Sequence, residues 1–338
     1  MKKFMNKADD FVKEMIEGVY LANQEKLKWV PEYNILYRAD MPSDEKVSII
    51  QGSGSGHEPA HIMYVGKGML DAACPGNVFA APPMDYVLAC TRIMNSKKGV
   101  LHLINNYQGD RMAWDMAREI AEAEGIKVGV VIIDDDVAVN NSTYTVGRRG
   151  VAGNFFVIKA CAAAAEKDAS LEELVELGKK VNSRVRSMGT ALTSCTPPAK
   201  GEPIFQIGED EIEIGIGIHG EPGRRREKMK SADEIMTELF NSVCNDLPFE
   251  KGDRVAVMIN GLGGTPIGEL YLLYRIAALK CKAKGLMIVR NYVGNYLLLW
   301  KWPGSLFPCL NVIKRLRDTL MLMQRFQFAY FDNIASGS

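Results

Sequence analysis

Three alternating glycines followed by a histidine are the residues of this sequence best suited to chemistry. They lie in the stretch Gly52–Pro59 (GSGSGHEP), which directly follows the apolar run Val47–Gln51. Glycines let a backbone approach a small ligand closely, and they leave N–H groups that can donate to it. A histidine beside such a loop can transfer protons, because its charge changes near neutral pH. The stretch predicts a binding loop with the proton-transfer group His57 at its end.

A second pattern overlaps this stretch. Residues 57–61 read H-E-x-x-H, the pattern of zinc hydrolases, with His57 and His61 at its ends. That chemistry needs both histidines on one helical face, together with a third ligand. Pro59 is tolerated only in the first turn of a helix, and neither His102 nor His219 shows a matching context. We therefore predict no metal at this site.

Nucleotide-binding patterns are incomplete in the chain. The glycine loop has the spacing G-x-G-x-G instead of G-x-G-x-x-G, and no acidic residue follows at the distance of a dinucleotide fingerprint. No G-x-x-x-x-G-K-[ST] phosphate loop occurs in the sequence. Residues Asp134–Asp136 could hold magnesium, although acidic residues at a strand end often cap a helix or complete a turn. We expect no cofactor in this chain.

The length and composition of the chain limit the possible folds and the possible classes of partner. The 338 residues exceed what one small core holds, so two domains are expected. Lys+Arg and Asp+Glu both number 41, which gives no electrostatic case for direct binding to nucleic acid or to an anionic membrane. No apolar stretch reaches membrane-spanning length, and the N-terminus lacks the apolar core of a secretory signal. The seven cysteines are scattered singly, which fits reduced thiols in a cytoplasmic protein.

Apolar periodicity predicts strands and helices in alternation. Buried strands are expected at residues 47–51, 100–104 and 128–133, and helices at residues 11–22, 112–124 and 151–167. Such alternation is typical of a parallel sheet covered by helices, whose ligands bind where the strands end. The segments at those ends are residues 52–59, 105–110 and 134–136.

A second α/β unit is expected after Pro197–Gly201, which we interpret as a linker. Residues 212–218 alternate strictly and predict a strand that ends at His219. Residues 254–260 and 286–290 predict further strands, with a helix between them that ends near Lys282. We therefore predict two α/β domains, residues 1–196 and 197–338, each with a largely parallel or mixed sheet covered by helices.

Taken together, these pieces resemble one family from about residue 10 to Tyr296, the dihydroxyacetone kinase subunit K family. The segments that carry the resemblance follow the family's order: Gly54–Pro59, Ala73–Gly76, Asn106–Asp110, Ile133–Val139, Tyr144–Ala152, Ala191–Pro197, Gly217–Gly223 and Asn260–Tyr271. The resemblance implies a protein that binds dihydroxyacetone.

The resemblance also implies roles for particular residues. In the family, the histidine of G-I-H-G-E-P-G, here His219, adds covalently to the ligand carbonyl as a hemiaminal, which selects carbonyl compounds over glycerol. The histidine of the glycine loop, here His57, and the aspartate of N-Y-x-G-D, here Asp110, bind the ligand hydroxyls, and in a kinase they activate the attacking one. The catalytic candidates are therefore His219, His57 and Asp110, and the substrate-binding candidates are Gly54, Ser55, Gly56, His57, Asn105, Asp110 and His219.

The sequence departs from the kinase pattern near the expected ligand. Asn105 stands where the family usually has a lysine that contacts the ligand, and Asn77 stands where it has an acidic residue. Ala80 and Ala81 replace two residues with hydroxyl groups. Losing a cation and two hydroxyls should weaken phosphoryl transfer more than carbonyl capture. We therefore favour the function of the DhaQ-type paralogues, which bind dihydroxyacetone and act as coactivators of a TetR-like regulator; the alternative is the dihydroxyacetone-binding subunit of the phosphotransferase-dependent kinase.

The resemblance implies partners as well. In the kinase the nucleotide sits on a separate L subunit, which accounts for the missing phosphate loop in this chain. The expected protein partners are a TetR-like transcription regulator or that L subunit, together with a second copy of the chain in a homodimer. We expect a cytoplasmic protein of glycerol metabolism that contacts neither nucleic acid nor membrane directly.

The resemblance stops after Tyr296. The family continues with patterns such as T-S-L-E-M-A-G and L-K-x-D-x-E-I, where this chain has Leu298–Gly304 (LLWKWPG) and Leu310–Arg317 (LNVIKRLR). The family pattern T-S-L-E-M-A-G can be encoded by ACT-TCT-CTG-GAA-ATG-GCC-GGG, and these codons read one base later encode L-L-W-K-W-P. In the same way, CTT-AAA-TGT-GAT-AAA-GAG-ATT-AAG encodes L-K-C-D-K-E-I-K, and the same codons read one base later encode L-N-V-I-K-R-L. Because one shift recovers both segments, we hypothesise a single-base frameshift near Tyr296 in the gene or its recorded sequence; the alternative is a divergent tail.

Overall fold

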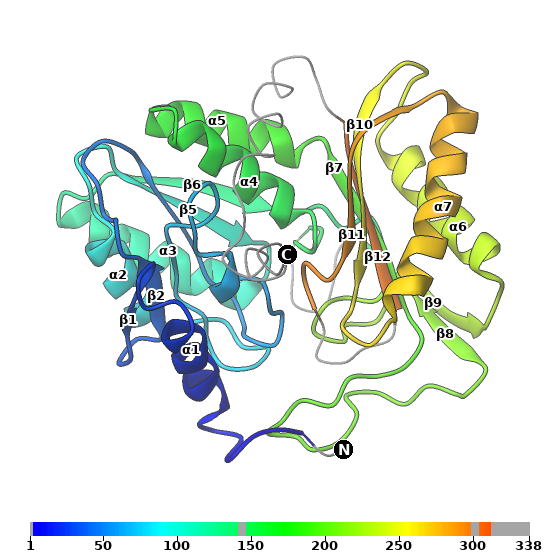
Figure 1. Ribbon diagram of the computed structural model, residues 1–338, viewed down its shortest axis with the longest axis horizontal. Coiled ribbons are helices and arrows are strands. Elements are labelled where there is room, and N and C mark those ends of the chain that lie inside the picture. Colours follow the sequence, from blue (N-terminus) through cyan, green and yellow to red (C-terminus); the bar gives the residue numbers. More distant parts are fainter. Residues whose placement is uncertain (1–2, 141–146, 299–303, 312–338) are drawn as a thin grey trace, which may run out of the picture. The chain divides into compact units, whose positions relative to one another are not determined.

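Two six-stranded sheets organise the chain, and each belongs to its own unit (Figure 1). The computed structural model describes residues 3–140, 147–298 and 304–311. The first unit comprises residues 3–132 and 157–180, and the second comprises the described residues within 133–156 and 181–314. Two α/β units are therefore present as predicted. The expected boundary at residue 196 differs from this division, because residues 133–156 and 181–196 group with the second unit.

The first sheet has the strand order β1-β2-β4-β3-β5-β6. Its strands are β1 (Leu27–Val30), β2 (Ile35–Arg38), β3 (Ser48–Gln51), β4 (Ala72–Ala73), β5 (Val100–Asn105) and β6 (Val128–Ile133). Strands β4, β3 and β5 run parallel, and β2 and β1 extend the sheet in antiparallel pairing. The three strands predicted from apolar runs are confirmed as β3, β5 and β6.

Helices pack on both faces of the first sheet. They are α1 (Phe11–Leu21), the 3-10 turn η1 (Ile62–Tyr64), α2 (Met84–Ile93), α3 (Gln108–Ala123), α4 (Asn154–Ala165) and α5 (Leu171–Asn182). On one face, Ile50 and Ile104 of the strands share a buried core with Trp114 of α3. On the other face, α5 comes so close to β6 that a Cβ at Gly178 would lie 2.7 Å from Val131. The parallel strands are thus buried on both sides, which is why they are continuously apolar.

The second sheet has the strand order β11-β10-β12-β7-β8-β9. Its strands are β7 (Val185–Ala191), β8 (Glu211–Ile214), β9 (Arg225–Lys228), β10 (Arg254–Gly261), β11 (Met287–Gly294) and β12 (Gly304–Asn311). Among these strands the β10–β11 pair is parallel and the other pairs are antiparallel. The second sheet is therefore mixed, as the sequence allowed, although it is mostly antiparallel.

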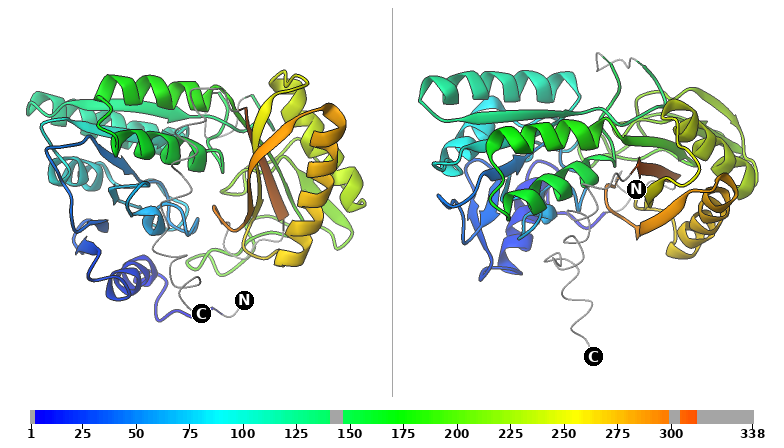
Figure 2. Two further views of the ribbon diagram at one scale, coloured as in Figure 1. Left: turned by 45° about the horizontal axis from the view of Figure 1, so that its top comes forward. Right: turned by 90° about the horizontal axis from the view of Figure 1, so that it is seen from above.

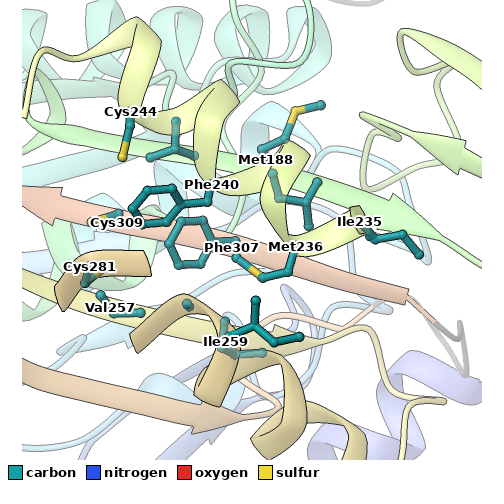
Figure 3. Packing of buried hydrophobic residues seen from close by; sticks show 14 of the residues in the cluster. Met188, Ile235, Met236, Phe240, Cys244, Val257, Ile259, Cys281, Phe307 and Cys309 are labelled. Carbon is teal, nitrogen blue, oxygen red and sulfur yellow. The ribbon is translucent and has the colours of Figure 1, made fainter. Parts of the chain in front are cut away.

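Two helices cover one face of the second sheet, α6 (Ala232–Asp246) and α7 (Ile267–Lys284), which lie side by side in Figures 1 and 2. Helix α6 begins with a complete capping box between Ser231 and Glu234. Figure 3 shows the core beneath the helices, where Phe240 of α6 faces Phe307 of β12 with ring centroids 5.9 Å apart. This contact fixes the helix layer against the centre of the sheet.

The strand predicted at residues 212–218 is shorter than expected. Strand β8 ends at Ile214, because Gly215 adopts a φ of +80°, which leaves the extended conformation. The chain then turns, so that His219 lies beyond the sheet rather than directly at a strand end. The alternating pattern of residues 212–218 therefore continues into a loop.

No helix of the described residues is long and apolar enough to cross a membrane. All seven cysteines are free and buried, so the prediction of reduced core thiols is confirmed.

Candidate functional site

The glycine loop, which we define as Gly52–His57, follows β3 in the first unit and runs beside residues 74–80. A Cβ at Gly52 would lie 2.3 Å from the carbonyl oxygen of Cys74, and one at Gly54 would lie 2.8 Å from the backbone of Phe79 and Ala80. Gly56 has a φ of +94°. The glycines are thus required by the neighbouring chain segment, a reason that differs from the expected approach of a ligand.

Several polar groups of the glycine loop bond within the protein. The N–H of Ser55 donates to the carbonyl of Asn77 at 3.1 Å, and the Ser55 hydroxyl donates to the carbonyl of Gly76 at 2.7 Å. The N–H of Gly56 donates to the Glu58 carboxylate at 3.0 Å. These N–H groups stabilise the loop itself, and the roles of Gly54, Ser55 and Gly56 toward a ligand remain predictions.

His57 is completely buried at the end of the loop. Its ring lies 5.2 Å from the ring of Phe79, centroid to centroid, with the planes tilted by 34°. Residues 57–61 form a bend and turn instead of a helix, so His57 and His61 do not share the helical face that a zinc hydrolase requires. No group of three or more His, Cys, Asp or Glu side chains among the described residues is placed to hold a metal ion.

Asp110 lies in the first turn of α3, where the helix dipole favours a carboxylate. It is buried, and its Oδ2 accepts a hydrogen bond of 2.7 Å from the hydroxyl of Ser53. Ser53 is buried as well and belongs to the glycine loop. The structure thus brings the loop after β3 and the helix after β5 together, as the topology of a parallel sheet predicts.

Asn105 ends strand β5 and is buried beside β3. Its Oδ1 accepts a long hydrogen bond of 3.5 Å from Nε2 of Gln51, whose Oε1 lies 2.7 Å from Nδ1 of His61. The Nδ2 group of Asn105 has no hydrogen-bond partner in the described part of the chain. A buried amide N–H without a hydrogen-bond partner destabilises the folded protein. A ligand oxygen beside Nδ2 would supply the missing acceptor. Asn105 therefore offers a neutral donor where the family usually has a lysine.

Trp114 and His102 form an aromatic cluster that contacts the glycine loop. The indole N–H of Trp114 donates to the carbonyl of Gly52 at 3.1 Å, and the ring of His102 packs edge-on against Trp114 at 4.9 Å. Burial, with a smaller contribution from the charge of Arg118, lowers the pKa of His102 to about 3. The imidazole of His102 is therefore neutral and supports the glycine loop structurally.

His219 lies in a tight turn of the second unit, with its side chain 15% exposed. Its Nδ1 is 3.0 Å from Oε1 of Glu221, and its backbone N–H donates to Oε2 of the same carboxylate at 2.9 Å. A Cβ at Gly217 would lie 2.1 Å from Oε2 of Glu221, so this position has room only for glycine. The G-I-H-G-E motif thus folds around one buried carboxylate.

The charge of Glu221 determines which nitrogen of His219 carries the proton. Burial raises the pKa of Glu221, but the charge and hydrogen bonds of His219 and the charge of Arg149 lower it to about 2. The carboxylate is therefore ionised at neutral pH and can only accept. Nδ1 of His219 must then carry a proton, so Nε2 is the nitrogen whose lone pair is available whenever the ring is uncharged.

A buried ion pair supports the same turn. Nη2 of Arg149 lies 2.7 Å from the Asp136 carboxylate, and the same nitrogen donates to the carbonyl of Gly215 at 2.7 Å. Asp135 accepts from the N–H groups of Val151 and Gly153, each at 2.8 Å, and burial raises its pKa to about 6. These acidic residues are occupied by protein donors, which argues against the magnesium alternative.

The structure therefore divides the predicted residues between the two units. Gly54, Ser55, Gly56, His57, Asn105 and Asp110 gather where β3 and β5 end in the first unit, whereas His219 belongs to the second unit. The sequence did not identify Gln51, Ser53 and Glu221 as parts of these sites. For Glu221, the close H-x-E spacing was a usable signal, because a carboxylate two residues from a histidine can reach its ring.

Comparisons with known proteins give matches over most of the chain. The profile of the Dak1 domain family matches residues 17–321. The chain is 42% identical over 312 residues to the dihydroxyacetone-binding subunit DhaK of PTS-dependent dihydroxyacetone kinase 1 from Listeria innocua, covering 92% of this chain and 94% of the relative. It is 40% identical over 337 residues to the DhaK subunit of the PEP-dependent kinase from Escherichia coli, covering 92% and 94%.

A solved structure is similar over nearly the whole chain. The dihydroxyacetone kinase operon co-activator Dha-DhaQ has a TM-score of 0.86 at 33% identity, covering 91% of this chain and 95% of the co-activator. The family match continues to residue 321, so the expectation that the resemblance ends after Tyr296 is wrong. Residues 299–303 and 312–338, which include most of the two segments behind the frameshift hypothesis, lie outside the described residues.

Proposed function

The chain belongs to the Dak1 domain family, and from this membership we propose that it binds dihydroxyacetone by forming a hemiaminal on His219. The observation that carries the proposal is the pairing of His219 Nδ1 with the ionised Glu221 carboxylate. This pairing directs the lone pair of the neutral imidazole to Nε2. An imidazole held in this tautomer is prepared to add to a ketone.

The proposed addition balances without a cofactor. Nε2 of His219 forms a bond to the carbonyl carbon, the π electron pair moves to the carbonyl oxygen, and that oxygen takes up one proton from solvent. The ring becomes a cation that keeps its Nδ1 proton on Glu221, whose negative charge lies 3.0 Å away. Glycerol has no carbonyl and cannot react, so the chemistry selects the ketone. The chain itself supplies no nucleotide or metal in this proposal.

We propose that His57, Asp110 and Asn105 bind the ligand's hydroxyl groups. His57, Asp110 and the neutral amide of Asn105 are buried where β3 and β5 end. Asp110 accepts from a hydroxyl, and Asn105 donates to an oxygen. An uncharged triose ketone with two hydroxyls matches this set of neutral donors and one acceptor.

We propose a ligand-sensing role, in which the chain acts as a coactivator of a TetR-like regulator of the dihydroxyacetone operon. Asn105 in place of a lysine removes the cation that a phosphoryl-transfer site uses against developing negative charge. The similarity to the co-activator Dha-DhaQ supports this role. We expect the chain to form a complex with the regulator, and we expect formation of this complex to require dihydroxyacetone.

The second candidate is a kinase subunit that presents dihydroxyacetone to a separate nucleotide-carrying L subunit. It is favoured by the 40–42% identity to DhaK subunits, which exceeds the 33% identity to the co-activator. The candidates differ in what they do with captured ligand, so one reconstituted reaction separates them.

The discriminating experiment mixes the purified chain with an L subunit of a related kinase, its phosphodonor and dihydroxyacetone. The sensing role predicts capture of the ketone without turnover above the L subunit alone. Turnover comparable to that of a DhaK subunit, run as a positive control, would establish the kinase role instead. An adjacent TetR-like gene would support the sensor, and adjacent L and M subunit genes would support the kinase.

We also propose that the chain forms a homodimer, as family membership suggests. Light scattering at micromolar concentration tests this directly. A monomer mass at that concentration would contradict it.

A further inference from the structure

One hydrogen bond in the glycine loop reaches a group that the proposed function uses. The hydroxyl of Ser53 donates to Oδ2 of Asp110 at 2.7 Å, and both side chains are at most 2% exposed. The two residues are 57 positions apart in the chain, so the fold alone brings them together. None of the roles assigned above involves Ser53.

The backbone around Ser53 is fixed on both sides. The carbonyl of Gly52 accepts from the indole of Trp114, and a Cβ at Gly52 or Gly54 would collide with backbone atoms. The carbonyl of Ser53 itself accepts from the N–H of Gly76 at 3.0 Å. A serine held between two such glycines has little freedom to move, so its hydroxyl stays directed at Asp110.

We propose that Ser53 is a positioning residue that keeps Asp110 ionised and oriented as an acceptor for a hydroxyl of the bound ligand. The inference rests on the proposed function of dihydroxyacetone binding, and it extends that function to a residue outside the predicted site. A hydroxyl donor stabilises a carboxylate and leaves it a weaker base. Ser53 therefore favours recognition of the ligand hydroxyl over removal of its proton.

Other titratable groups lie near Asp110, and they define what the experiment must control. Burial, the neighbouring Cys90 thiol and the charge of Asp110 raise the pKa of the Cys74 thiol well above the usual value. Cys74 is therefore neutral across the working range. Arg111 follows Asp110 on α3, and His57 ends the facing loop.

The test compares dihydroxyacetone affinity from pH 4.5 to 8.5 in the wild-type chain and in Ser53→Ala. Removing the hydroxyl is expected to weaken binding about tenfold and to move the acid limb of the affinity profile about one pH unit upward, because one hydrogen bond to the charged form is lost. Asp110→Asn should remove the Asp110 contribution to the acid limb and leave that of His219, whose ring adds to the ketone only when uncharged. Thermal unfolding of each variant confirms that it is folded.

Ser55→Ala is the matched control, because Ser55 lies in the same loop and donates to a backbone carbonyl instead of an acid. Its affinity can change, but its acid limb should coincide with that of the wild type. An unshifted limb in Ser53→Ala, or an equal shift in Ser55→Ala, would overturn the proposal.

A ligand-free readout separates this inference from the proposed function. In protein labelled with ¹³C at the aspartate carboxyl carbon, the Asp110 resonance should titrate at higher pH in Ser53→Ala than in the wild type. If dihydroxyacetone does not bind at all, the proposed function fails, and the carboxyl titration still decides whether Ser53 holds Asp110 ionised. Identical titrations would refute the role of Ser53 even if binding is confirmed.

Discussion

The carboxylate of Glu221 holds His219 at two points, with Oε1 3.0 Å from Nδ1 of the ring and Oε2 2.9 Å from the backbone nitrogen. One buried anion thus fixes both the turn and the imidazole. Because the carboxylate is ionised, it also fixes the tautomer. A motif that looks like a simple glycine-rich turn in the sequence therefore holds the tautomer of His219 that the proposed adduct requires.

Glu221→Gln should weaken dihydroxyacetone capture. The amide keeps the shape of the side chain but removes the negative charge that stabilises the ring cation of the adduct. A hydrogen bond to a charged group is worth about 1.5–3 kcal/mol, so the affinity should fall roughly ten- to a hundredfold. Isothermal titration calorimetry measures it. Glu238→Gln on α6, whose partner is the exposed Arg225, serves as the control and should bind like the wild type. Equal affinities in all three proteins would contradict the account.

His102 should make the protein sensitive to acid. Its pKa is about 3 in the folded chain, against about 6.5 for an unperturbed histidine, so the unfolded state binds the proton first. The stability is therefore complete above pH 6.5 and is lost as the pH falls toward 3, by at most about 1.4 kcal/mol per pH unit. His102→Gln, which cannot titrate, should show a flatter dependence in urea unfolding between pH 6.5 and 4. The same slope in both proteins would show that His102 is not responsible.

Asp71 should be a major contributor to the stability of the first unit. It is fully buried; its Oδ1 accepts from Arg38 at 2.7 Å and from Lys46 at 2.9 Å, and its Oδ2 accepts from the N–H of Ile49 at 2.8 Å. Asp71→Asn leaves buried cations with less compensation, which costs about 3–5 kcal/mol. Asp40→Asn, at an exposed partner of the same arginine, should cost less than about 1 kcal/mol. Denaturant unfolding of the two variants compares these costs, and similar losses would contradict the assignment.

The parts of the fold that could be predicted are those with a strong local pattern. Strands β3 and β5 are buried on both faces, and β6 alternates buried with half-buried apolar residues, so all three are visible as apolar runs in the sequence. Strand β9 (Arg225–Lys228) was not predicted, because its sequence, RREK, is entirely charged and mostly exposed at the sheet edge. Its place depends on antiparallel pairing with β8 and not on its own composition.

The candidate site likewise contains residues that could be predicted from the sequence and a contact that could not. His57, Asn105 and Asp110 could be placed because they follow predicted strands, and the ends of parallel strands meet at one edge. The bond from Ser53 to Asp110 could not be predicted, since it joins residues 57 positions apart through the exact approach of a loop and a helix. The sequence correctly predicted a special loop at the glycines. The structure shows that glycine is needed there because residues 74–80 leave no room for a Cβ.

The family match reaches residue 321, so the frameshift hypothesis now depends on the two shifted segments alone, and it makes a prediction about the C-terminal sequence. Strand β12 lies between β10 and β7 in the sheet, yet its sequence contains Pro308, which has no N–H to donate in a central strand. A frameshifted sequence would explain an ill-suited residue at this place. Resequencing the gene, together with mass spectrometry of C-terminal peptides of the natural product, should yield a sequence like T-S-L-E-M-A-G after Tyr296. Peptides that span Trp300 to Arg315 as printed would end the hypothesis.

The most direct test of the central claim is nuclear magnetic resonance of the chain with dihydroxyacetone carrying ¹³C at its carbonyl carbon. The account predicts that the ketone resonance is replaced by that of a tetrahedral carbon, coupled to the Nε2 nitrogen in protein labelled with ¹⁵N-histidine. The new resonance should be absent in His219→Asn and for glycerol. A bound ligand that keeps its ketone resonance at saturation would contradict covalent capture by His219.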